Sequence, residues 1–183
     1  KETIQQEIEN FKKLAGQFLV SENSGKVEII LGEILKSKNL KISTAESCTG
    51  GMIASMLTSV SGSSAYYFGT IVSYDTSVKI NVLNVDEKAI EEFTVVSEQV
   101  AEQMAKGVKN VLNTNIAIST TGVAGPNRGE DNNDVGTVWI SVTNGNTTSN
   151  KRYFYPFLDR EDFIKIVSTN TLNDAVKFIQ ENY

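Results

Sequence analysis

Residues 43–51, STAESCTGG, join a short apolar run, Leu40–Ile42, to an apolar-periodic segment that begins at Met52. The run predicts the end of a β-strand and the periodic segment predicts a helix, so the stretch between them is a strand-to-helix turn. Free backbone N–H groups at a helix start favour negative charge. We expect Ser47 at or near that start. The amides would come from the three residues that follow it, Cys48, Thr49 and Gly50.

This turn has two interpretations. In the functional one, Ser47 is a nucleophile beside ready-made oxyanion donors. In the structural one, the stretch is a helix N-cap with glycines that allow close packing. Cys48 adds a further alternative, because a thiolate at a helix N-terminus is a strong nucleophile and could act with Glu46 and Lys79. A lone cysteine is also commonly a small buried core residue.

The chain has 183 residues, which fits a single domain over 1–183. Its net charge of -5 makes a nucleic-acid partner unlikely. Its apolar runs are too short to span a bilayer, and no secretory signal opens the sequence. A single cysteine allows no internal disulfide, which is consistent with a cytoplasmic protein.

The sequence contains no histidine. A Ser-His-Asp or Cys-His catalytic triad is therefore impossible, and so are zinc sites built from histidine or paired cysteines. Acid–base chemistry must use Lys, Tyr, Asp, Glu or groups of the substrate. We expect no metal and no organic cofactor.

Helical and strand patterns alternate along the chain. An apolar helical stripe over residues 1–20 predicts an N-terminal helical extension, 1–24, on a core of residues 25–183. Further helices are predicted around Ile29–Leu35, after Asp75, from Ser97, and from Arg160 to the C-terminus. Strands are predicted over Ala65–Tyr74, Asn115–Thr120, Gly136–Thr143 and Thr148–Phe154, the last two joined by an Asn144–Asn146 hairpin turn. This pattern predicts an α/β/α sandwich on a mixed sheet of about five strands.

Three polar stretches follow predicted strand ends, where open α/β sheets bind ligands. They are the Ser47 turn, Tyr74 with Lys79, and the glycine-rich loop Thr121–Gly129. If they meet, a desolvated Lys79 could act as base for Ser47, and Tyr74 could relay a proton. The alternatives are a solvated lysine on a helix and a tyrosine that packs across strands.

The glycine-rich loop could cradle a phosphate with its amides and Arg128. It lacks the Lys-Ser/Thr ending of a Walker A loop and the spacing of a dinucleotide fingerprint. A plain connecting loop is the alternative. Arg160, which follows Asp159, could be a helix-start residue in an ion pair instead of a ligand-binding residue.

Several motifs together resemble the CinA C-terminal domain family over Gly25–Tyr183. The motifs are Ala45–Gly51, Gly62–Tyr66, Ser73-Tyr74 with Lys79, Val96–Glu98, Thr121–Pro126 and Val135–Val138. The resemblance implies an α/β/α sandwich on a mixed five-stranded sheet, usually dimeric. It also implies a serine nucleophile with a lysine, which places those roles on Ser47 and Lys79, with Tyr74 beside them.

In that family the domain is associated with nicotinamide mononucleotide amidohydrolase activity. The leading hypothesis is therefore hydrolysis of the carboxamide of this nucleotide by Ser47 and Lys79. The oxyanion and substrate would be bound by Cys48, Thr49, Gly50, Thr121, Gly122, Gly125, Arg128 and Arg160. The alternative is a non-catalytic nucleotide-binding or protein-interaction module that serves competence or DNA repair. Residues 127–134, which differ from the usual family loop, favour this alternative.

Overall fold

The computed structural model describes residues 25–129 and 133–183, together with the isolated positions 4, 6, 7 and 10. The helix predicted over residues 1–20, and the extension 1–24 to which it belongs, therefore lie outside the described residues apart from those four positions.

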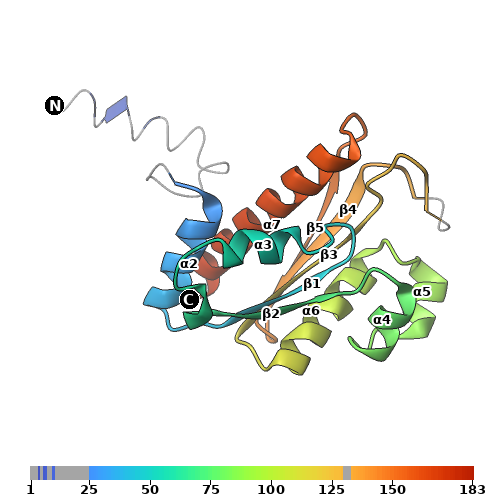
Figure 1. The fold of residues 1–183 in the computed structure, drawn as a ribbon, viewed down its shortest axis with the longest axis horizontal. Coiled ribbons are helices and arrows are strands. Elements are labelled where there is room, and N and C mark those ends of the chain that lie inside the picture. The colour runs from blue at the N-terminus through green and yellow to red at the C-terminus, as the bar shows by residue number, and fades with distance from the viewer. Residues whose placement is uncertain (1–3, 5, 8–9, 11–24, 130–132) are drawn as a thin grey trace.

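In the described part of the chain, five strands form one mixed sheet in the order β2-β1-β3-β4-β5 (Figure 1). β1 pairs in parallel with β2 and β3, and β4 pairs antiparallel with β3 and β5. The strand bounds are Ile42–Glu46 (β1), Tyr67–Val72 (β2), Ile116–Gly122 (β3), Thr137–Thr143 (β4) and Thr148–Phe154 (β5). The prediction of a mixed, five-stranded sheet is confirmed.

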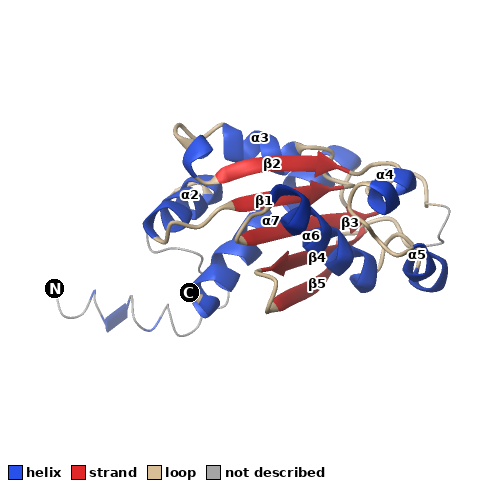
Figure 2. Ribbon diagram, turned by 90° about the horizontal axis from the view of Figure 1, so that it is seen from below, coloured by secondary structure: helices blue, strands red, loops and turns tan. Residues whose placement is uncertain are grey.

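Helices cover both faces of the sheet, as predicted. Helices α2, α3 and α7 lie on one face, and α4, α5 and α6 lie on the other (Figure 2). The helix bounds are Val27–Ser37 (α2), Met52–Thr58 (α3), Thr76–Asn81 (α4), Glu87–Phe93 (α5), Glu98–Leu112 (α6) and Arg160–Asn182 (α7), with a 3₁₀ turn at Ser63–Ala65. The architecture is a three-layer α/β/α sandwich.

The central strands supply both layers of the core because successive strand residues face opposite sides. Ile116 and Ile118 of β3 pack with α2, α3 and α7, whereas Ala117 between them packs with α6. In β1, Ile42 faces the first layer and Ala45 the second. Every residue of β1 is buried, so the strand that leads to Ser47 is held from both sides.

Two predicted boundaries are wrong. The strand predicted to end at Ile42 instead begins there and continues through Glu46. Small hydroxyl residues resemble a turn in the sequence, but they are satisfied inside the fold: Ser43 Oγ lies 2.7 Å from Thr114 Oγ1. The strand predicted over Ala65–Tyr74 is limited to Tyr67–Val72, which leaves Tyr74 in a loop. Helix α5 was not predicted.

The helices predicted after Asp75 and from Ser97 are present, each with a side-chain cap, and so is the predicted hairpin. The Asp75 carboxylate accepts from the Ser77 amide at 2.8 Å at the start of α4. Ser97 Oγ accepts from the Val100 amide at 3.3 Å at the start of α6. Asn144 Oδ1 accepts from the amides of Asn146 and Thr147 in the β4–β5 turn.

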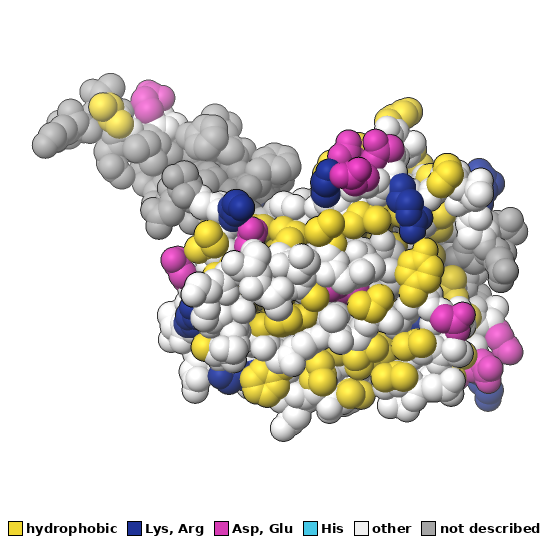
Figure 3. Space-filling model, viewed as in Figure 1, with side chains coloured by type: hydrophobic (Ala, Val, Ile, Leu, Met, Phe, Trp, Pro, Cys, Tyr) yellow, Lys and Arg dark blue, Asp and Glu magenta, His cyan; other side chains and the backbone are white. Residues whose placement is uncertain are grey.

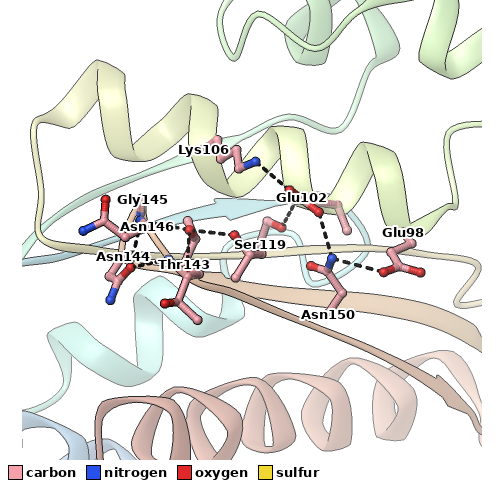
Figure 4. A network of polar contacts seen from close by, with 12 residues as sticks. Glu98, Glu102, Lys106, Ser119, Thr143, Asn144, Gly145, Asn146 and Asn150 are labelled. Carbon is pink, nitrogen blue, oxygen red and sulfur yellow. Dashed lines mark hydrogen bonds and ion pairs between the residues drawn. The ribbon is translucent and has the colours of Figure 1, made fainter. Parts of the chain in front are cut away.

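Polar side chains tie α6 to the sheet at its β5 side (Figure 4). Asn150 Nδ2 on β5 donates to Glu102 at 2.9 Å and to Glu98 at 3.2 Å. Lys106 donates to Glu102 from one turn further along α6 at 2.6 Å. Ser119 Oγ on β3 donates to the Ala101 carbonyl. These contacts hold α6 against β3 and β5.

The β2 edge of the sheet exposes apolar side chains, including Phe68 at 52% and Val72 at 42%. Hydrophobic atoms are spread over the side of the molecule that Figure 3 shows. Among the described residues, no helix has both the length and the apolar character that crossing a membrane requires.

Candidate active site

The three parallel strands bring their carboxyl ends to one edge of the sheet. After β1 the chain passes into α3 on one face, and after β2 it passes into α4–α6 on the other. Open α/β sheets form a ligand crevice at such a switch of faces. A cleft of about 210 Å³ lies here, at the ends of all three strands.

The cleft gathers most of the predicted site residues. Those that line it are Ser47, Cys48, Tyr74, Lys79, Thr121, Gly122, Gly125 and Arg160. Three predicted residues do not line it: Thr49, Gly50 and Arg128. Val123, Ala124, Asn127 and Gly129 also line it and lie within the predicted loop Thr121–Gly129, whereas sequence reasoning missed Thr76, Val95 and Val96 as lining residues. The three polar stretches therefore do meet, as the topology of a parallel sheet requires.

Ser47 is the first residue after β1 and is partly exposed in the cleft. Its amide donates to the Thr120 carbonyl of β3 at 3.0 Å, which extends the β1–β3 pairing to the nucleophile candidate. Its carbonyl accepts from the Gly50 amide at 3.2 Å and closes a tight turn. Gly50, at φ 60°, is exposed on that turn. The prediction that Ser47 stands at the helix start is wrong, because α3 begins at Met52.

The N-terminus of α3 is capped by Glu46, a fully buried residue that the sequence did not single out for this role. Its carboxylate accepts from the amides of Gly51, Ile53 and Ala54 at 2.8 to 3.1 Å. It also accepts from Thr49 Oγ1 at 2.8 Å. The positive end of the helix is therefore neutralised from inside the protein. The Gly50 amide is not free for an oxyanion either, because it donates to the Ser47 carbonyl.

Lys79 lies on α4 and is only 2% exposed. Its Nζ donates to the Ser73 carbonyl at 2.6 Å and to the Tyr74 carbonyl at 3.3 Å, both at the end of β2. Burial lowers the pKa of the Lys79 amine below its ordinary value, while the charge of Asp75 opposes the shift. The alternative of a solvated lysine on a helix surface is excluded by this burial.

Cys48 lies beside Ser47 but in a different environment. Burial raises the pKa of the Cys48 thiol to about 12, against a hydrogen bond with Thr120 that acts in the other direction. The side chain packs in a cluster with Val138, Ile140 and Phe163. At neutral pH this thiol is protonated, so Cys48 is a buried core residue whose surface touches the cleft.

Tyr74 and Arg160 form the rim of the cleft. Tyr74 is 64% exposed, so the interpretation of this residue as a cross-strand packing tyrosine is wrong. Arg160 donates to the Tyr74 hydroxyl at 3.0 Å and to the Gly125 carbonyl at 2.8 Å. It thereby links the loop after β2, the loop after β3 and the start of α7. The helix itself is capped by Asp159, which accepts from the Asp162 amide.

Arg128 lies outside the cleft. It is exposed and forms an ion pair with Asp134 at 2.6 Å within its own loop. Gly125 marks the part of this loop that does line the cleft. At φ 79°, an added Cβ there would approach Val135 Cγ1 to 2.6 Å, so the turn requires glycine.

The charges around the cleft have one sign. Lys79 and Arg160 line it, and no carboxylate is present among the described lining residues. In the part of the chain that the structure describes, no group of three or more His, Cys, Asp or Glu side chains is placed to hold a metal ion. The arrangement suits an anionic ligand held at the rim, with a hydroxyl and a buried amine beneath it.

Known proteins are similar to this chain in sequence and in fold. Residues 25–181 match the CinA C-terminal domain family. A CinA-like protein of Flavobacterium psychrophilum is 42% identical over 184 residues, which cover 100% of this chain and 44% of that protein. A CinA-like protein of Salinibacter ruber is 44% identical over 142 residues, or 78% of this chain and 34% of that protein. The chain thus spans less than half the length of these relatives.

Solved structures agree. A competence-damaged protein (CinA) superfamily protein from Klebsiella pneumoniae superposes with a TM-score of 0.82 at 26% identity, covering 87% of this chain and 99% of the other. A competence/damage inducible protein from Agrobacterium tumefaciens has a TM-score of 0.75 at 32% identity, covering 88% and 98%. Because the family model matches residues 25–181, which is most of the chain, the chain belongs to the CinA C-terminal domain family.

Proposed function

We propose that the chain is an amidohydrolase that converts nicotinamide mononucleotide to nicotinate mononucleotide and ammonia. The observation that carries this proposal is that a serine, Ser47, and a buried lysine, Lys79, line the same cleft of a histidine-free chain. Carboxamide hydrolysis by a serine requires a proton acceptor. Burial lowers the pKa of Lys79 and so favours the neutral amine that can serve.

A neutral amine at Lys79 can make both of the hydrogen bonds that the structure shows. Such an amine has two N–H donors and one lone pair. The two donors are used by the carbonyls of Ser73 and Tyr74, which leaves the lone pair for the Ser47 hydroxyl proton. The Ser47 oxygen then bonds to the carboxamide carbon and forms a tetrahedral intermediate.

The lysine ammonium next gives its proton to the amide nitrogen, the C–N bond breaks, and ammonia leaves. A nicotinoyl ester on Ser47 remains. Water attacks this ester, Lys79 takes the proton of the water, and the proton returns to the serine oxygen as the acid is released. We assign oxyanion stabilisation to the amide of Cys48, which lines the cleft, and not to that of Thr49, which does not line it.

The other end of the substrate is anionic, and the cleft has the matching charge. Arg160 stands at the rim, and the backbone of Gly122–Gly125 borders the same space. A guanidinium with several N–H donors suits a phosphomonoester. Arg160 rather than Arg128 is the arginine we assign to the phosphate, because Arg128 is ion-paired outside the cleft.

The test is ammonia release from nicotinamide mononucleotide by the purified protein, with Ser47→Ala as the matched control. We expect release with the wild type and almost none with the variant. Binding of the nucleotide without any ammonia release would contradict the proposal and favour a non-catalytic nucleotide-binding module. The homodimer and the cytoplasmic location that we expect from the sequence stay predictions, and light scattering of the purified chain tests the first.

A further inference from the structure

The turn between α5 and α6 contains a strained residue beside the cleft. Thr94 has φ 69° and ψ 166°, a combination that glycine adopts freely and a β-branched residue rarely adopts. Such strain persists only where surrounding contacts hold the backbone, and it is concentrated at binding and catalytic sites. Val95 and Val96, which follow Thr94 directly, both line the cleft.

The backbone of Thr94 is held by the two helices that it joins. Its amide donates to the Ile90 carbonyl at 2.9 Å at the end of α5. Its carbonyl accepts from Ser97 Oγ at 2.9 Å, and that oxygen also caps α6 by accepting from the Val100 amide. The turn is therefore anchored on both sides of the strained residue.

Two further segments hold the turn against the cleft. Asn133 Nδ2 donates to Thr94 Oγ1 at 3.0 Å and to the Val96 carbonyl at 3.4 Å. Thr121 Oγ1 donates to the Val95 carbonyl at 2.7 Å, and Thr121 itself lines the cleft. The position of the two valines is thus set relative to the loop that follows β3.

We propose that Thr94 is a positioning residue whose positive-φ backbone sets Val95 and Val96 as the apolar wall that receives the planar ring of the substrate. Val96 is 6% exposed and Val95 is half-buried, so the wall is fixed in place. A negative φ at Thr94 would redirect the chain and move Val95. The inference rests on the proposed function, because the ring is that of nicotinamide mononucleotide.

The test separates backbone conformation from side-chain contact. Thr94→Val keeps the β-branched shape and the strain but loses the oxygen that accepts from Asn133. The turn should relax, and the KM for nicotinamide mononucleotide should rise about tenfold, as for partial loss of an apolar contact in a pocket. Thr94→Gly adopts the native backbone without strain, so its KM should stay close to the wild-type value. For both variants, kcat and the pH profile should be unchanged.

Thermal unfolding gives a second readout. Thr94→Gly should unfold at a higher temperature than Thr94→Val. The matched control is Thr169, an exposed residue within α7. At this position Thr169→Val should unfold at a higher temperature than Thr169→Gly, because valine has a higher helix propensity than glycine. Neither Thr169 variant should change KM.

A wild-type KM for Thr94→Val, or a higher KM for Thr94→Gly than for Thr94→Val, would overturn the inference while leaving the proposed function intact. A wild-type protein that neither binds nor hydrolyses nicotinamide mononucleotide would overturn the proposed function, and the assignment of the ring would fall with it.

Discussion

At the scale of single residues, burial decides which of two adjacent nucleophiles can react. A thiolate is intrinsically the better nucleophile, yet burial raises the pKa of Cys48 to about 12. Its neighbour Ser47 is partly exposed in the cleft and needs only a base within reach. The environment of each side chain, and not its intrinsic reactivity, therefore favours the serine.

We predict that Ser47→Ala lowers turnover of nicotinamide mononucleotide by roughly 10⁴-fold or more, as loss of a nucleophile does. Cys48→Ala should keep most of the activity, since it removes a protonated thiol from the edge of the core. Ammonia release by both variants, with circular dichroism to confirm folding, is the measurement. An inactive Cys48→Ala enzyme beside an active Ser47→Ala enzyme would reverse the assignment.

The protonation of Lys79 should determine whether kcat rises or falls with pH. Its folded pKa lies below the ordinary value of 10.5, and the neutral form is the proposed base. We predict that kcat rises with pH through an apparent pKa below 10.5. Lys79→Arg keeps a cation that does not deprotonate near neutral pH, so it should be folded and nearly inactive. An active Lys79→Arg enzyme would show that the lysine acts as a fixed charge, and Tyr74 would then be the next candidate base.

Most of the residues that line the cleft could be predicted from the sequence, but their contacts could not. The lack of histidine and the position of Lys79 after a strand already favoured a lysine base. The bridge from Arg160 to Tyr74 joins residues 86 positions apart, and no local pattern signals it. Arg128 looked equally suitable as a phosphate ligand until its ion pair with Asp134 placed it outside the cleft.

At the scale of elements, Glu46, the last residue of β1, connects this strand to the first turn of α3. Its carboxylate accepts hydrogen bonds from three amides at the helix start, where negative charge is favoured. Since Ser47 lies between strand and helix, this one carboxylate fixes both ends of the segment that carries the proposed nucleophile.

We predict that Glu46→Gln lowers the free energy of unfolding by about 2 kcal/mol, the usual worth of hydrogen bonds to a charged group. A glutamine must also turn an NH₂ group towards donors that have no acceptor to offer. Glu33→Gln, an exposed change on α2, is the control and should stay within about 0.5 kcal/mol of the wild type. Urea unfolding measures both, and equal stabilities would show that the carboxylate charge at Glu46 is dispensable.

Element types were easier to predict than element ends. The β4–β5 hairpin was predictable because Asn144–Asn146 is a local turn signal, and the α6 cap because Ser97 precedes a strongly periodic segment. The β1 boundary was not, because Ser43 and Thr44 have the composition of a turn. The Ser43 hydroxyl is satisfied by a distant partner, Thr114, that only the folded sheet supplies.

At the scale of the whole molecule, the charge of the chain and the charge of the cleft have opposite signs. The net charge is -5, whereas the cleft is lined by the cation Arg160 and by Lys79, whose amine is neutral in the proposed base form. The order β2-β1-β3 brings these two residues to one cleft, because it places the ends of three parallel strands at one edge. A crevice at the carboxyl ends of the strands is expected for this class of fold. The observed strand order places the three strand ends side by side, so their residues meet in one cleft.

An acidic protein with a cationic cleft should discriminate by substrate charge. We predict that Arg160→Ala weakens binding of nicotinamide mononucleotide by about 10- to 100-fold, the range for a lost hydrogen bond to a charged group. Binding of nicotinamide riboside, which lacks the phosphate, should change little. Arg128→Ala is the matched control, because it removes the same charge from a neighbouring loop outside the cleft, and it should leave the preference for the phosphorylated ligand intact. Calorimetric titration of both ligands measures the preference. The opposite result is a smaller preference for the mononucleotide over the riboside in Arg128→Ala and an unchanged preference in Arg160→Ala. It would place the phosphate at the loop of residues 127–134 and not at the rim that Tyr74 and Arg160 form.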